Sequence, residues 1–196
     1  MNHPAELTSR QRMLESTIRL LRESGLSGAG INEIVRASGA PKGSVYHFFP
    51  GGKSQIVAEA LALYSGRVQD FMETALAGAE APADKVRALF AAFARRVEEG
   101  DFHASCAAGA VCLDLDVDLE FLRLVLAETF ADWVSRIAGH FGALGPERAR
   151  SFASIVLTAI EGAYIRCRAA RSSLAFLEVG EWLAPLVGPV GQHLAS

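Results

Sequence analysis

The 196-residue chain has few cysteines and no long apolar run, and each shortage excludes a class of protein. Its three cysteines are an odd number and widely scattered, which argues against a disulfide framework and fits a reducing compartment. No apolar stretch approaches the roughly 18 residues needed to span a bilayer. The first residues lack the apolar core of a signal peptide. We therefore expect a soluble, cytoplasmic protein with no membrane partner.

The chain also lacks an excess of positive charge, since its formal net charge is -3. The charge is unevenly distributed: residues 1–53 hold seven basic and four acidic side chains, whereas residues 54–196 hold twelve and eighteen. A basic head on an acidic body indicates that the head faces a polyanion. The hydrophobic content of 51% excludes a disordered chain.

No segment shows the pattern of a β-strand of any length, whereas helical periodicity is found along most of the chain. The first helix is expected to end at Gly25 and to be followed by a loop over residues 26–30. Two more short helices are expected before residue 50, with a glycine turn between them. We predict an all-α fold of about nine helices, in which a helix-turn-helix head (residues 1–52) precedes a larger helical bundle (residues 53–196).

The most unusual stretch is SGAPKGSVYHFFPGGKSQI, residues 38–56. Within it, residues 42–49 predict a short helix whose small first residues let another molecule approach the backbone, as in the major-groove helix of a helix-turn-helix protein. Val45 and Phe49 are expected to face inward. Gly51 to Lys53 open the next helix, where free amides suit a phosphate. A hydrophobic helix packed in an ordinary bundle is the alternative interpretation.

Residues 25–53 resemble the DNA-binding domain of TetR-type transcriptional repressors. The match runs in order through Gly25-Leu26, Ile31, Ile34, Gly39, Lys42 to Tyr46, Phe49 and Lys53. The segments at 105–115 and 160–172 are similar to the LmrA/YxaF-like branch of that family. The resemblance implies a homodimeric, ligand-responsive repressor of a pseudo-palindromic operator in double-stranded DNA. The long helix beginning at Lys53 would join its effector pocket to its head.

The resemblance also implies which residues contact DNA. These candidates are Asn32, Lys42, Gly43, Ser44, Tyr46, His47 and Lys53, the last as a phosphate contact. Tyr46 has a packing role as its alternative, and His47 the role of a surface imidazole. The sequence departs from the family where Ala29 and Gly30 replace a hydroxyl residue, and where Pro41 stands in place of a common serine.

Six aromatic residues have two interpretations: they line an apolar ligand cavity between helices, or they pack in an ordinary core. They are Phe71, Phe90, Phe93, Phe130, Trp133 and Tyr164. The resemblance implies that a pocket for a small-molecule effector, apolar or aromatic, exists among them. The segment at 151–165 is apolar almost all round and must be covered on both sides. The resemblance implies a homodimer through the last two long helices, and a central helix of a monomeric bundle is the alternative.

Other reactive residues give weaker patterns. His103, Cys106 and Cys112 lack the fourth ligand and the close pairing of a zinc site, and DLDVDLE at 114–120 lacks the glycine and glutamate of a calcium loop. We expect no catalytic residue, no metal and no cofactor. Two alternatives stay open: a helical protein-interaction module that does not read DNA, and a small all-α enzyme that uses His103 and Cys106.

Overall fold

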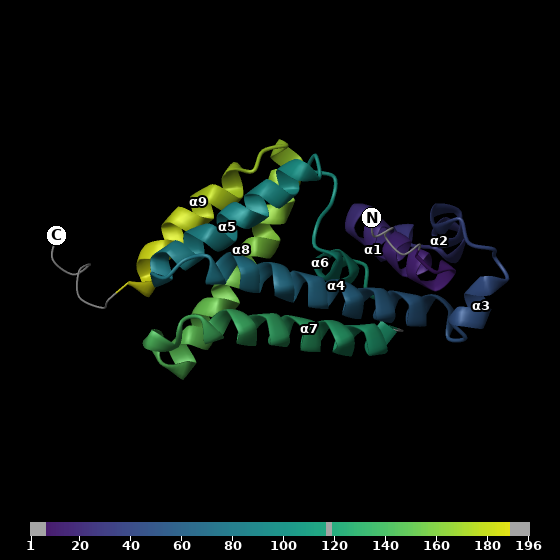
Figure 1. Ribbon diagram of the computed structural model, residues 1–196, viewed down its shortest axis with the longest axis horizontal. Helices are drawn as coiled ribbons and strands as arrows, with labels where there is room; N and C mark the ends of the chain where they lie inside the picture. Colours follow the sequence, from purple (N-terminus) through teal and green to yellow (C-terminus); the bar gives the residue numbers. More distant parts are fainter. Residues whose placement is uncertain (1–6, 117–118, 189–196) are drawn as a thin grey trace, which may run out of the picture. The chain divides into compact units, whose positions relative to one another are not determined.

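The computed structural model describes residues 7–116 and 119–188. Within these residues the chain forms nine α-helices and two short 3₁₀ helices, with no β-strand (Figure 1). The elements are α1 (Ser9–Gly28), α2 (Ile31–Ser38), α3 (Ser44–Phe48), α4 (Gly52–Ala77), α5 (Pro82–Glu99), α6 (Ala107–Leu113), α7 (Glu120–Gly139), η2 (Gly142–Leu144), α8 (Pro146–Ala170), α9 (Leu174–Leu183) and η3 (Ala184–Val187). The predicted all-α fold is confirmed.

Contacts divide the helices into two compact units. The first contains the described residues of 1–66 and 106–129, and the second contains those of 67–105 and 130–196. Residues 106–129, which include α6, therefore belong with the N-terminal helices although they lie far along the chain. The functional boundary predicted between residues 52 and 53 is a different kind of division and stays a prediction.

Helix α1 begins with a capping box and breaks near its end. The Thr8 hydroxyl accepts the amide N–H of Gln11 at 3.2 Å, and the Thr8 N–H donates to Gln11 Oε1 at 2.8 Å. Gly25 has a φ of 69° and a ψ of −169°, which interrupts the helical backbone. The predicted loop over residues 26–30 is wrong in its first half, because the chain makes a further helical turn before Ala29.

A tight turn joins α2 to α3. Gly39 ends α2 with a φ of 62°, a left-handed conformation that glycine adopts without strain. The carbonyls of Pro41 and Lys42 accept the N–H groups of Ser44 (2.9 Å) and Val45 (3.2 Å). Helix α3 is therefore shorter than the predicted helix over residues 42–49, since its first two residues form this turn.

The second unit has an aromatic core around Phe93. Its ring lies 5.0 Å from the ring of Phe71, 5.9 Å from Tyr164 and 5.7 Å from Phe176, centroid to centroid. Helices α5 and α9 lie side by side here (Figure 1). A Cβ atom at Gly180 of α9 would lie only 2.8 Å from the Phe90 Cβ of α5, so a glycine is needed for this close approach.

Candidate nucleic-acid interface

Helix α3 has an inner and an outer face. Val45 and Phe49 are fully buried, which confirms the predicted inward face and fixes the rotation of the helix. On the other side Tyr46 is 60% exposed, and Lys42 and His47 are also exposed. Two buried anchors thus hold a five-residue helix whose remaining polar groups point outward. Ser44, at its first turn, is half-buried.

Gly43, at the start of α3, is a glycine that the fold does not require. Its φ of −64° and ψ of −20° are right-handed helical values open to any residue. Apart from Gly43 itself and its two chain neighbours, no atom of the described residues lies within 4 Å of where its Cβ would be. Gly39, four residues earlier, is constrained by its left-handed backbone instead. The missing side chain at Gly43 therefore leaves open space on the outer side of the helix start.

The predicted phosphate clamp at residues 51–53 has protein partners. The Gly51 N–H donates to Gln55 Oε1 at 2.8 Å, and the Gly52 N–H donates to the Phe49 carbonyl at 2.9 Å. The Lys53 ammonium donates to the Leu26 carbonyl at 2.8 Å. These contacts brace the corner between α3 and α4. A phosphate contact by Lys53 stays a prediction, for which the ammonium keeps two further N–H donors.

Asn32 lies on the exposed side of α2, as a groove or phosphate contact requires. Arg36, one helical turn further, is also exposed and lies 4.0 Å from Glu33, guanidinium to carboxylate. Arg36 was not singled out in the sequence, although its spacing of four from Asn32 places both on one helix face. The outer faces of α2 and α3 and the turn between them together present Asn32, Arg36, Lys42, Tyr46 and His47.

Two arginines of the basic head hold the head together. The Arg12 guanidinium donates to the Ser38 carbonyl at 3.1 Å and to the Leu7 carbonyl at 2.9 Å, which ties α1 to the end of α2. Arg10 pairs with Glu59 of α4, and its guanidinium lies 5.1 Å from the centroid of the Phe49 ring. From the sequence, both arginines were expected to contribute to the positive charge that faces a polyanion. The sequence could not predict these contacts, because Ser38 and Glu59 are far from the two arginines along the chain.

The six predicted ligand residues have different surroundings. Phe90, Phe93, Trp133 and Tyr164 are buried, and Phe93 and Tyr164 belong to the aromatic core described above. Phe71 also touches that core and lines a hollow of about 260 Å³ with Arg95 and Arg96. Phe130 packs edge-on against Trp133 at 5.6 Å, centroid to centroid. Their role in ligand binding stays a prediction.

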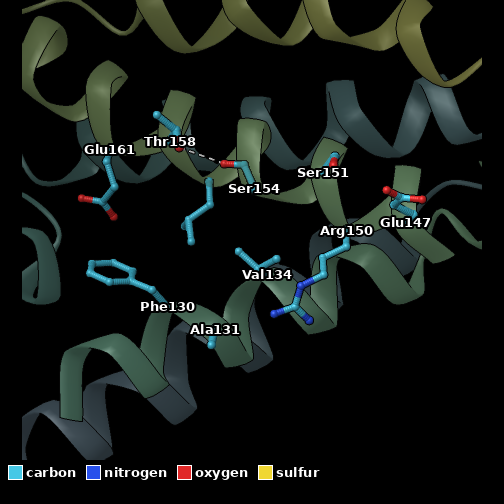
Figure 2. A pocket seen from close by; sticks show the side chains of 10 residues that line it. Phe130, Ala131, Val134, Glu147, Arg150, Ser151, Ser154, Thr158 and Glu161 are labelled. Atoms are coloured by element: carbon cyan, nitrogen blue, oxygen red, sulfur yellow. Dashed lines mark hydrogen bonds between the residues drawn. The ribbon is translucent and has the colours of Figure 1, made fainter. Parts of the chain in front are cut away.

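Phe130 also lines a groove of about 660 Å³ between α7 and α8. Figure 2 shows Phe130, Ala131 and Val134 of α7 facing the polar side chains of α8. The α8 wall consists of Glu147, Arg150, Ser151, Ser154, Leu157, Thr158 and Glu161. The Thr158 hydroxyl donates to the Ser154 carbonyl at 2.9 Å, so it is satisfied within its own helix. The groove thus has an apolar floor with charged groups at its ends.

The residues of the zinc-site and enzyme alternatives differ in their exposure to solvent. Cys106 is buried, whereas His103 is exposed and lies 3.3 Å from the Asp101 carboxylate. Among the described residues no three His, Cys, Asp or Glu side chains are grouped so that they could hold a metal ion. The acidic segment at 114–120, which lacks the pattern of a calcium loop, includes residues 117–118, and these lie outside the described residues. Within those same limits, no helix has the length and apolar character to cross a membrane.

Sequence families match both parts of the chain. A model of bacterial regulatory proteins of the tetR family matches residues 13–60. A model of the C-terminal domain of LmrA/YxaF-like transcriptional regulators matches residues 82–182. An uncharacterized helix-turn-helix transcriptional regulator of Mycobacterium tuberculosis is 32% identical over 169 residues, covering 83% of this chain and 85% of the relative. The transcriptional regulator LmrA of Bacillus subtilis is 26% identical over 181 residues, covering 91% and 96%.

Solved structures show the same fold. The regulatory protein TetR from Rhodobacter sphaeroides has a TM-score of 0.80 and 21% identity, covering 90% of this chain and 97% of its own. A cysteine mutant of CifR, a TetR family transcriptional regulator, was solved with a 26-base-pair double-strand operator DNA. It has a TM-score of 0.78 and 19% identity, covering 94% of this chain and 98% of its own.

Proposed function

The chain belongs to the TetR family of bacterial regulatory proteins, and on this premise we propose that it is a repressor released from its operator by a small-molecule effector. A member of this family is a DNA-binding transcriptional regulator and not an enzyme. The enzyme alternative with His103 and Cys106 is therefore set aside. The finer proposal has three parts: a pseudo-palindromic operator, a homodimer, and an apolar or aromatic effector. A cytoplasmic location goes with DNA binding.

The observation that carries the proposal is the outer side of α3. Gly43 leaves space that no protein atom fills, beside exposed Lys42, Tyr46 and His47. A recognition helix places its first residues at base edges and phosphates, and a side chain at its start would separate the backbone from the DNA. Gly66 and Gly162, in α4 and α8, leave similar space, so the proposal rests on the place of Gly43 at the start of α3, beside these three exposed side chains. The CifR mutant, which has the same fold, was solved with operator DNA, and this supports DNA binding as the proposed function.

The proposed homodimer explains an exposed apolar face on the last two long helices. The outward residues include Ile155 and Ile165 of α8, Leu174, Leu177 and Trp182 of α9, and Leu186 of η3. Trp182 is 81% exposed. Large exposed apolar patches mark interaction sites, and we propose that these side chains form one. A second copy of the chain is the proposed partner, since a two-fold axis would bring two heads to the two halves of a palindrome.

The groove between α7 and α8 is the proposed effector site. Phe130, Val134 and Leu157 provide apolar contact, while Arg150 and Glu161 are placed to orient a polar end of the ligand. An effector releases DNA only if it binds the two conformers of the repressor with different affinity. The long helix α4, which starts at the head, is the proposed lever between them.

The test is a salt titration of duplex DNA binding by the wild type and by Lys42→Ala. A phosphate-contacting lysine makes binding weaken steeply as salt rises, and its loss is expected to reduce the slope of log affinity against log salt by about one. Lys85→Ala, on α5, is the matched control, because it removes the same charge outside the head. Its slope is expected to equal that of the wild type.

Two results would count against the proposal. Equal slopes for Lys42→Ala and the wild type would remove Lys42, in the turn before α3, from the DNA contact. No binding of any duplex at low salt would favour the helical protein-interaction module, which keeps the head but does not read DNA. Effector release is tested separately, by screening compounds for a thermal shift and then measuring operator affinity in their presence. A stabilising compound that leaves operator affinity unchanged would contradict the inducer role.

A further inference from the structure

In the first unit, the end of α6 lies against the last turn of α1. We call the segment Gly25 to Ser27, where the α1 backbone changes direction, the α1 corner. Gly25 interrupts α1 with its φ of 69°. A Cβ atom at this position would lie 2.5 Å from Oδ2 of Asp114, which is well inside contact distance. Two features therefore require a glycine at position 25: the positive φ of its backbone and the close approach of the Asp114 carboxylate.

Hydrogen bonds from the corner hold the Asp114 carboxylate. The Ser27 N–H and the Ser27 hydroxyl both donate to Oδ2, at 2.9 Å and 3.0 Å. The Ser27 backbone bond, with smaller contributions from the Ser27 hydroxyl, the Leu26 N–H and the charge of Lys53, holds the pKa of Asp114 below its usual range. The carboxylate is therefore ionised near neutral pH, and its hydrogen bonds are of the stronger charge-assisted kind.

Lys53 connects the α1 corner (Gly25 to Ser27) to the end of α3. Its ammonium donates to the Leu26 carbonyl at 2.8 Å, and Lys53 follows α3 by only a few residues. Helix α6 itself buries Ala107, Ala108 and Val111. Such small apolar contacts have little directional preference, so the carboxylate supplies the direction in which α6 meets the corner.

We propose that Asp114 is a positioning residue, which ties α6 to the corner formed by Gly25, Leu26 and Ser27 and, through Lys53, to the base of α3. Asp114 lies in the part of the sequence that the C-terminal family model matches, whereas Gly25, Ser27 and Lys53 lie in the part that the N-terminal model matches. The tie thus joins the two sequence modules within one compact unit. A displacement of α6 then changes the head, and operator binding changes α6.

The inference rests on the proposed function, because the coupling is defined by operator binding. Its test uses amide hydrogen exchange of the 196-residue chain, with and without the duplex that the wild type enriches from a random DNA pool. Coupling between sites is reciprocal, so the duplex is expected to slow exchange of the α6 amides in the wild type by at least about threefold. In Asp114→Asn this slowing is expected to vanish, while α2 and α3 remain protected by the duplex.

The DNA-free protein gives a second readout. Asp114→Asn keeps the shape of the side chain but removes its charge, so exchange at Leu26 and Ser27 is expected to rise by about tenfold as charge-assisted bonds become neutral ones. Glu120→Gln is the matched control, because its carboxylate bonds Arg123 within α7. It is expected to change neither readout. If Asp114→Asn does not fold, Ser27→Ala removes one donor and is expected to weaken the coupling partially.

Equal slowing of α6 in the wild type and in Asp114→Asn would overturn the tie. So would a wild type in which the duplex protects α2 and α3 but leaves α6 unchanged, although DNA binding itself would then stand. A wild type that enriches no duplex fails at an earlier step, because that result contradicts the proposed function. Unchanged exchange at Leu26 and Ser27 in DNA-free Asp114→Asn would contradict the tie in either case.

Discussion

Gly39 and Gly43, two glycines of the head, are under different constraints. Gly39 has a left-handed backbone, whereas Gly43 has ordinary helical angles and open space around it. The fold does not require a glycine at position 43, and close approach of DNA is the role that we propose for it. Stability and DNA binding should therefore respond differently to substitution at the two positions.

We predict that Gly43→Ala changes the free energy of unfolding by no more than about 0.5 kcal/mol. The same substitution is expected to weaken operator binding by at least about tenfold, since the added methyl group separates the helix start from the DNA. Gly39→Ala is the contrasting variant, expected to lose about 1 kcal/mol of stability because alanine is strained at a φ of 62°. Denaturant unfolding and fluorescence anisotropy with operator DNA measure the two effects. Unchanged affinity of Gly43→Ala would contradict this interpretation of the helix start.

A pH dependence follows from the lowered pKa of Asp114. A carboxyl group whose pKa is lower in the folded state stabilises the fold above its unfolded pKa, and this contribution is lost as pH falls through the folded value. We predict that the stability difference between the wild type and Asp114→Asn is constant above about pH 5 and shrinks toward zero below the usual aspartate range. Urea unfolding of both proteins across acidic pH measures it. A difference that persists undiminished at the lowest pH would contradict the ionised carboxylate.

At the scale of elements, the packing of α5 on α9 depends on Gly180. We predict that Gly180→Ala destabilises the protein by about 1–3 kcal/mol, because the new methyl group must displace the Phe90 side chain at its root. Gly66→Ala is the matched control within helix α4, where no atom lies within 4 Å of the added Cβ. There alanine is expected to stabilise by up to about 1 kcal/mol through its helix propensity. Equal effects of the two substitutions in thermal unfolding would contradict the tight α5–α9 contact.

The sequence predicted most of the helices and the inward face of α3, because helices and their buried faces follow from local periodicity. Val45 and Phe49 are four residues apart and both face inward, as one helix face requires. The sequence could not predict the bond between Ser27 and Asp114, whose residues are 87 positions apart. Nor could it assign a partner to Lys53, because an ammonium can donate to a carbonyl as well as to a phosphate, and the sequence does not distinguish the two.

The six predicted aromatic ligand residues show a second limit. Composition gives an aromatic side chain the same character whether it fills a core or lines a cavity. The structure places Phe93 and Tyr164 in dense ring contacts and Phe130 at an open groove, and only geometry separates these cases. The polar residues of that groove, such as Arg150 and Glu161, carried no signal in the sequence because charged residues on α8 resemble an ordinary solvated face.

At the scale of the whole molecule, the proposed dimer predicts which apolar surface a charge disrupts. We predict that Ile165→Glu on α8 raises the dimer dissociation constant by at least about tenfold, because a carboxylate would be buried without a partner. Phe121→Glu on α7 is the matched control, since Phe121 is 59% exposed and Ile165 is 64% exposed. Sedimentation equilibrium measures both. A dimer weakened by Phe121→Glu and not by Ile165→Glu would place the interface elsewhere.

The central claim is that two identical heads each place α3 in the DNA major groove. Its most direct measurement is the enrichment of duplexes from a random pool by the wild-type protein, followed by sequencing. We predict an inverted repeat whose half-site centres lie about 34 Å apart, or a multiple of that distance, as a symmetric helix-turn-helix dimer requires. Enrichment of a single unrepeated site, or of no sequence at all, would contradict the claim.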